Sequence, residues 1–190
     1  ILIFSLLLII PVATLAFADV IYYYTGTINV GLAKTQPITF TYNGQTTGPN
    51  GNVPGYILFK GSNTGFTVNL NITNSSSAYF YQAGYLTVNT AGYIYVTSIS
   101  LGGSNNLVNS MTIYIQNMNT GATVASFTII NNGQPVTTPS SAISLSTGTY
   151  YISISVVPNT PLPQPSTGST ETITVNFGYN LVSASAIPQP

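Results

Sequence analysis

The pattern of apolar and polar positions divides the chain into two parts. Residues 1–18 are almost wholly apolar, and the first charged residue is Asp19. A helix that is apolar on every side has to be buried in lipid or in protein. The pattern therefore predicts a hydrophobic N-terminal helix over residues 1–26, which Pro11 would kink because proline lacks an amide hydrogen.

From residue 38 onward, apolar and polar residues alternate in short stretches separated by Gly, Asn and Pro. In residues 66–73, Phe66, Val68 and Leu70 share one face, and Thr and Asn occupy the other. About ten such stretches predict an antiparallel, immunoglobulin-like β-sandwich over residues 38–190. Residues 27–37 are then a linker, with Gly26 and Gly31 as its hinge. The fold class expected from the whole chain is α+β.

Charge changes the picture most, because the 190 residues include only Lys34, Lys60, Asp19 and Glu171 as charged side chains. That is 2% of the sequence, against about 25% in an ordinary soluble domain. There is no histidine and no cysteine, which removes the usual ligands for zinc, iron or copper. General acid–base catalysis and nucleic-acid binding have almost nothing to use. We therefore expect a protein that is not an enzyme and has no cofactor, metal site or nucleic-acid partner.

Two short motifs and one residue type are candidates for surface roles. Asn71-Ile72-Thr73 and Asn74-Ser75-Ser76 match the acceptor pattern for N-linked glycans. Sugars there would help an uncharged surface to stay soluble. The 14 tyrosines are expected mainly to pack, with their hydroxyls reaching a partner, and an adhesive tyrosine surface is the alternative.

Three interpretations of the apolar segment remain open on the residues alone. It is a cleavable secretory signal that ends at Ala16-Phe17-Ala18, a transmembrane helix, or a helix buried against copies of itself. In the transmembrane interpretation, Tyr22, Tyr23 and Tyr24 would lie at the membrane interface.

This organisation resembles that of archaeal type IV pilins, of the adhesive-pilus kind found in Crenarchaeota. The resemblance covers the whole chain as a pattern, although Ser5 stands where bacterial pilins carry Glu. It implies a homopolymeric, helical, extracellular filament whose subunits are held in the membrane before assembly. The N-terminal helices would pack in the filament core through Ile1, Phe4, Leu8, Pro11 and Leu15. The β-domains would be exposed, would carry glycans and would contact an adhesion target.

Two other functions are open. In a different kind of filament, cleavage near Ala18 would leave residues 19–32 as a donated strand that completes the sheet of the next subunit. In the other, the chain is a membrane-anchored monomer, such as an S-layer-associated or sugar-binding surface protein.

Overall fold

The computed structural model describes residues 25–28, 35–42, 56–103, 106–163 and 171–181. The chain divides into two units, residues 1–33 and 34–190. The positions expected in the filament core, from Ile1 to Leu15, lie outside the described residues, and so does the expected hinge residue Gly31. The other expected hinge residue, Gly26, is exposed and belongs to no helix or strand.

The predicted α+β class is wrong for the part of the chain that the structure describes. That part contains no helix, is about 64% strand, and forms a curled antiparallel sheet. It consequently holds no helix able to cross a membrane. The alternation of apolar and polar positions explains the strands, because a period of two places every second side chain on the same face.

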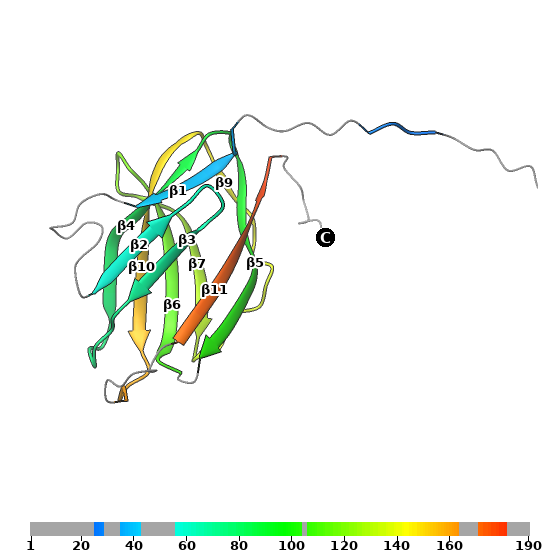
Figure 1. Cartoon of the computed structure of the whole chain (residues 1–190). Helices are drawn as coiled ribbons and strands as arrows, with labels where there is room; N and C mark the ends of the chain where they lie inside the picture. The colour runs from blue at the N-terminus through cyan, green and yellow to red at the C-terminus, as the bar shows by residue number, and fades with distance from the viewer. Residues whose placement is uncertain (1–24, 29–34, 43–55, 104–105, 164–170, 182–190) are drawn as a thin grey trace, which may run out of the picture. The chain divides into compact units, whose positions relative to one another are not determined.

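Eleven strands make up the described part of the second unit (Figure 1). They are β1 (Ile38–Tyr42), β2 (Ile57–Gly61), β3 (Phe66–Leu70), β4 (Ala78–Val88), β5 (Gly92–Gly103), β6 (Val108–Asn117), β7 (Thr123–Asn131), β8 (Gln134–Pro135), β9 (Ile143–Leu145), β10 (Gly148–Pro158) and β11 (Glu171–Asn180). One sheet has the order β1-β4-β10-β6-β7-β8, a second has the order β11-β5-β9, and β2 and β3 form a separate hairpin. Every pairing is antiparallel.

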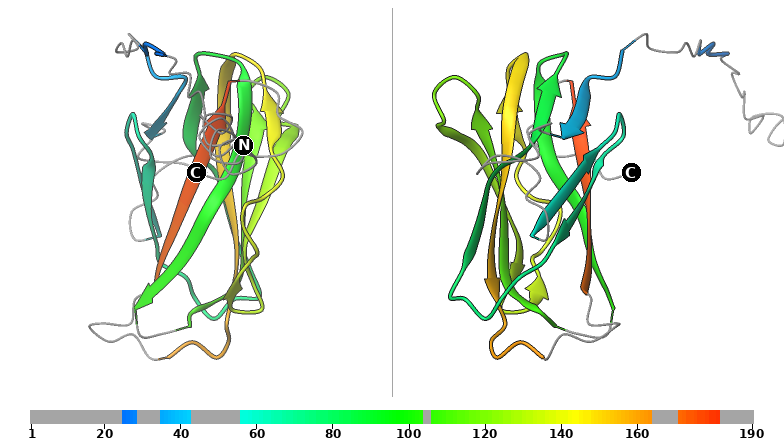
Figure 2. Two further views of the ribbon diagram at one scale, coloured as in Figure 1. Left: turned by 90° about the vertical axis from the view of Figure 1, so that its right-hand side faces the viewer. Right: turned by 60° about the vertical axis from the view of Figure 1, so that its left-hand side comes forward.

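Backbone hydrogen bonds link these sheets around one interior (Figure 2). On one side, the Phe40 amide donates to the Ser62 carbonyl at 3.0 Å, which ties β1 to the turn of the β2–β3 hairpin. On the other side, the Val136 amide donates to Ile129 at 3.1 Å, and the Ser140 amide donates to Val96 at 2.9 Å. The segment after β8 thereby connects β7 to β5. Taken in order, the neighbouring strands run around the core from β3 to β11.

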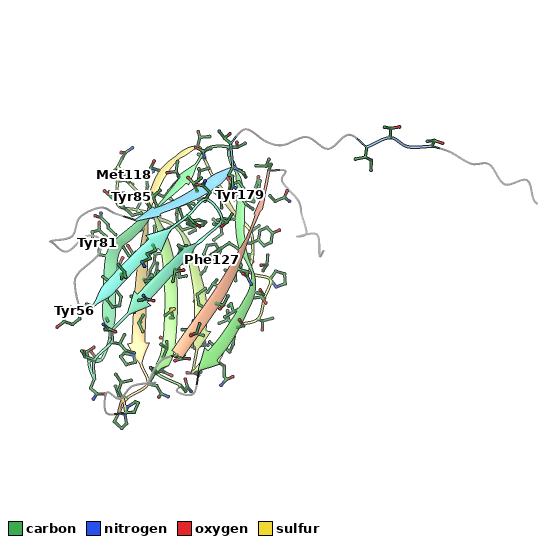
Figure 3. The ribbon with its side chains drawn as sticks, viewed as in Figure 1. Tyr56, Tyr81, Tyr85, Met118, Phe127 and Tyr179 are labelled. Atoms are coloured by element: carbon green, nitrogen blue, oxygen red, sulfur yellow. The ribbon has the colours of Figure 1, made fainter. Side chains whose placement is uncertain are left out.

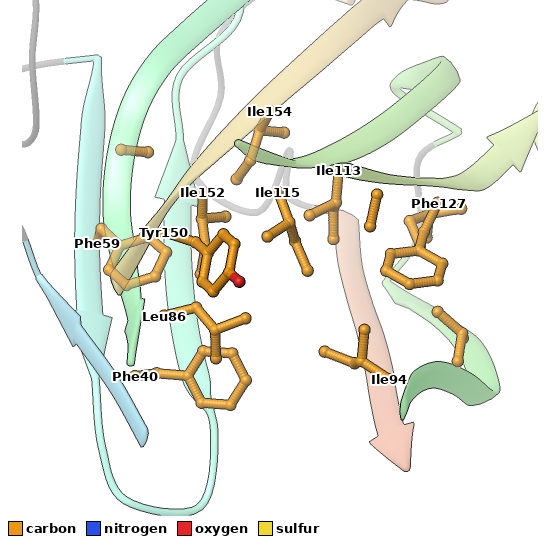
Figure 4. Packing of buried hydrophobic residues seen from close by; sticks show 14 of the residues in the cluster. Phe40, Phe59, Leu86, Ile94, Ile113, Ile115, Phe127, Tyr150, Ile152 and Ile154 are labelled. Carbon is orange, nitrogen blue, oxygen red and sulfur yellow. The ribbon is translucent and has the colours of Figure 1, made fainter. Parts of the chain in front are cut away.

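The core is built from the inward face of each strand (Figure 4). Leu86 of β4, Ile94 of β5 and Ile152 of β10 are at most 1% exposed. Gly84 has a packing role, because a Cβ atom there would meet the ring of Phe59. The missing side chain lets β2 lie closely over β4, and burial of this apolar surface is the main favourable contribution to folding.

We predict that Ile152→Ala lowers the free energy of unfolding by about 2–5 kcal/mol, because it leaves a cavity in a closely packed interior. Chemical denaturation checks this value. The control is Val124→Ala, at a β7 position that is 38% exposed, for which we expect a loss below about 1 kcal/mol. Equal losses in the two variants would show that the core does not lie where we describe it.

Candidate assembly and glycosylation surfaces

Among the described strands, the order of neighbouring strands around the core is interrupted between β3 and β11. Each of these strands is the last in its sheet, and within the described residues the two do not pair with each other. Figure 1 and Figure 2 show the β2–β3 hairpin and β11 on the same side of the unit. We call this interruption the β3–β11 seam, and define it by β3 and residues 171–177 of β11.

The rings of Phe66 and Phe177 meet across one end of the seam. Their centroids are 6.0 Å apart, and each ring also contacts the core, Phe66 through Phe59 at 5.1 Å and Phe177 through Phe127 at 5.9 Å. In Figure 1, β3 and β11 run in opposite directions and at an angle to each other away from this contact. The aromatic contact fixes the seam at one end.

Beyond the phenylalanines, the core is incompletely covered. On β3 and β11 the apolar residues are half-buried and the residues between them are exposed, which gives the alternation of an inward and an outward face. Many inward residues of the other strands are almost fully buried, as at Ile94 and Ile152, although Ile38 of β1 and Ile143 of β9 are also half-buried. On β3 and β11, the half-buried apolar side chains packed against the core include Val68, Leu70, Ile173 and Val175.

Tyrosines gather on the outward face of the six-stranded sheet. Tyr79 contacts Tyr81 and Tyr114, with ring centroids 6.0 and 6.1 Å apart. Tyr85 of β4 faces its cross-strand partner Tyr151 of β10 at 5.4 Å. Figure 3 labels Tyr81 and Tyr85 along this face. These five residues, which we call the tyrosine row, lie on three adjacent strands in two contacting groups, with Tyr79 52% and Tyr81 37% exposed.

Other tyrosines pack as the sequence predicted. Tyr150 is buried, and its hydroxyl donates to the Ser146 carbonyl at 2.9 Å. The Tyr179 hydroxyl donates to the Thr90 carbonyl at 2.7 Å. The tyrosines therefore divide between packing and an exposed row.

A buried polar network lies beneath the tyrosine row. The Ser153 hydroxyl is fully buried and donates to Gln116 Oε1 at 2.6 Å, while the Gln82 amide donates to the Ser153 hydroxyl at 2.9 Å. Gln116 Nε2 donates in turn to the Tyr79 hydroxyl at 3.3 Å. Gln82 has a positive φ of 51°, beside a shift in register between β4 and β10. The network thus stabilises a bulge in β4, which explains why the alternating pattern there reads as two separate stretches, residues 79–81 and 84–89.

Both glycosylation candidates are exposed at one end of the unit. Asn71 directly follows β3 instead of lying within a strand, and its amide donates to the Tyr56 carbonyl at 2.9 Å. Asn74 accepts a hydrogen bond from the Leu162 amide at its Oδ1, at 2.7 Å. Asn71 and Asn74 are both exposed, and N-linked glycans at these positions stay a prediction.

The few charged groups form no catalytic arrangement in the part of the chain described here. Glu171 accepts hydrogen bonds at Oε2 from the amides of Leu107 and Val108, at 2.7 and 3.0 Å, so it fixes the start of β6 instead of being fully solvated. Lys60 is exposed. Asp19 and Lys34 lie outside the described residues. No group of three potential metal-ligating side chains occurs among the residues with described positions.

No protein-family model matches the chain, and no curated protein sequence matches it.

Sequence reasoning identified the alternating strands on either side of the seam but not the seam itself. The sequence feature that could have indicated the seam is the absence of protective residues on its edges, since residues 66–70 and 172–179 contain no charge and no proline. Exposed sheet edges in soluble proteins are normally protected by such residues. That signal has meaning only once these strands are known to be edges.

For the polar network, we predict that Ser153→Ala lowers the free energy of unfolding by about 1–3 kcal/mol, because it removes two hydrogen bonds inside a water-excluded region. Ser155→Ala, two residues along the same strand and only half-buried, is the matched control and should cost less than about 0.5 kcal/mol. Denaturant titration of both variants measures the difference. An unchanged stability for Ser153→Ala would contradict the role of the network.

The tyrosine row predicts a stability loss at high pH. Burial, and secondly the neighbouring Tyr151, raise the pKa of Tyr85 above its ordinary value of 10.0. The folded state therefore holds this proton more tightly than the unfolded chain does. The contribution of Tyr85 to the free energy of unfolding is fully present below pH 10.0, and it is lost as the pH rises through the raised pKa. Tyr151→Phe should lower the pKa of Tyr85, as followed by ultraviolet absorbance titration. A pKa at or below 10.0 in the folded wild-type protein would contradict this account.

Proposed function

We propose that this chain is a structural subunit of an extracellular, homopolymeric helical filament. Residues 1–33 join one subunit to the next, and the β unit forms the exposed part of the filament. The observation that carries the proposal is a β unit whose apolar interior opens along one seam, in a chain whose other unit has an almost uncharged sequence.

Low charge favours association over dispersal. Four charged side chains give little electrostatic repulsion between copies, so an uncharged surface of this kind tends to self-associate. A contact between two different surfaces of the same chain does not close on itself, and it propagates as an open helix. The seam and the first unit are two such different parts of one molecule.

The surface of the β unit fits exposure at the outside of a filament. The tyrosine row presents amphipathic rings of the kind that are enriched where proteins bind partners. We propose that this row contacts the adhesion target and that Asn71 and Asn74 carry N-linked glycans. Before assembly, the apolar residues 1–18 hold the subunit at the membrane.

A membrane-anchored monomer is the second candidate, and the same apolar stretch favours it. It places the β unit on the cell surface with the seam unfilled. The two candidates differ in whether the native protein is polymeric.

Negative-stain electron microscopy of material sheared from cells, with N-terminal sequencing of the same sample, tests the proposal. We expect filaments composed of this chain. Sequences that begin near Ile1 would show that the whole apolar segment is retained in the filament, and sequences that begin near Asp19 would show that it has been removed. A protein that stays in the membrane fraction as a detergent-soluble monomer would contradict the proposal and support the anchored monomer.

A further inference from the structure

We infer that the β3–β11 seam is a binding site for one β-strand, and that the strand is residues 19–32 of a second copy of this chain. The inference rests on the proposed filament and deepens it by naming the contact between subunits. The inserted strand would lie between β3 and β11 and would join the β2–β3 hairpin to the β11-β5-β9 sheet.

The first argument concerns the strand edges. The edges of β3 and β11 that face the seam present backbone groups able to pair with a further strand. Outward-facing Thr67 and Asn69 on β3, and Thr172 and Thr174 on β11, are uncharged and do not oppose such pairing. Addition of a strand supplies backbone hydrogen bonds along both edges at once, which is the general basis of recognition by β-augmentation.

The second argument concerns the interior. The core is complete at Leu86, Ile94 and Ile152, which are at most 1% exposed, whereas the apolar side chains at the seam are half-buried. A strand inserted there would cover Val68 and Val175 with its own inward side chains. Removal of this apolar surface from water favours binding.

The third argument is the sequence of the proposed occupant. Residues 19–32 read Asp-Val-Ile-Tyr-Tyr-Tyr-Thr-Gly-Thr-Ile-Asn-Val-Gly-Leu. One face of an extended strand would carry Val20, Tyr22, Tyr24, Gly26, Ile28, Val30 and Leu32. From Thr25 onward the other face carries Thr25, Thr27 and Asn29, the same residue types that β3 and β11 present outward. The segment is thus apolar on the side that would meet the core.

Length and charge agree with this occupant. The segment is longer than the ten-residue β11, so it is able to run along the whole seam. After Asp19 it contains no charge, and the only charged residue at the seam, Glu171, is already bonded to two amides. Because β3 and β11 run in opposite directions, the inserted strand is antiparallel to one and parallel to the other (Figure 1).

A second copy is the proposed donor because a segment passed from chain to chain joins subunits into a filament. Ile28, on the apolar face of the segment, is 89% exposed. Each chain then offers one segment and one seam, which are different surfaces. The segment of each subunit occupies the seam of the next, so the contact propagates along a filament.

The first test compares Ile28→Asp with Thr27→Asp in the full-length chain. Both positions are exposed in the single chain, so both variants should unfold at the same denaturant concentration as the wild type. We expect loss of filaments with Ile28→Asp, which places a charge against the core, and normal filaments with Thr27→Asp, which faces outward. Equal filament yields from the two variants would overturn the inference. Absence of filaments from the wild-type chain would instead contradict the proposed function.

The second test uses disulfide trapping. Because the chain has no cysteine of its own, only the introduced cysteines can form disulfides. Three double variants each carry Thr174→Cys on β11 together with a cysteine at Thr25, Thr27 or Asn29, which scans the register of the inserted strand. We expect one of them, oxidised in filaments, to give a ladder of covalent oligomers on a non-reducing gel. Cysteine at the exposed Thr128 on β7 replaces Thr174→Cys in the control series and should give no ladder.

Three outcomes of the trapping would overturn the inference. They are filaments without any ladder, a ladder of equal strength in the Thr128 series, and a cross-linked monomer, which would mean that the segment fills the seam of its own chain.

Discussion

The edges of the β-strands are the constraint on which this molecule depends. A backbone amide or carbonyl that is shielded from water needs a partner, and an exposed edge invites pairing with another chain. This chain has four charged residues with which to protect its edges. Most strand edges are instead covered because the sheet curls around one core. Hydrogen bonds join β1 to the β2–β3 hairpin and the segment after β8 to β5. At the β3–β11 seam, the two described strand edges are not paired with each other.

The same shortage of charge shapes the rest of the surface. Outward positions carry Thr, Asn, Ser and Tyr, which interact with water through hydroxyls and amides. Beneath the tyrosine row, the buried hydrogen bonds of Ser153 and Gln116 reach the hydroxyl of Tyr79. One face of the unit is thereby suited to contact with a foreign surface, while the seam is suited to contact with another subunit.

The sequence predicted the strands because alternation is a local property. It divided β4 into residues 79–81 and 84–89 because the bulge at Gln82 interrupts the alternation, and it extended β3 through Thr73 because nothing local shows where pairing with β2 ends. The α+β class was wrong for the described residues because it depended on a helix expected within residues 1–26, of which the structure describes only 25 and 26, and neither of these is helical. The seam was not predictable, since the meeting of Phe66 with Phe177 depends on the whole order of strands between them.

A helical reconstruction of the filament by cryo-electron microscopy, at a resolution that separates individual strands, tests the central claim most directly. The account predicts one additional strand between β3 and β11 in every subunit. Its density would continue through the linker into β1 of the adjacent subunit. A filament in which the seam is empty, or in which the subunits meet only through other surfaces, would contradict it.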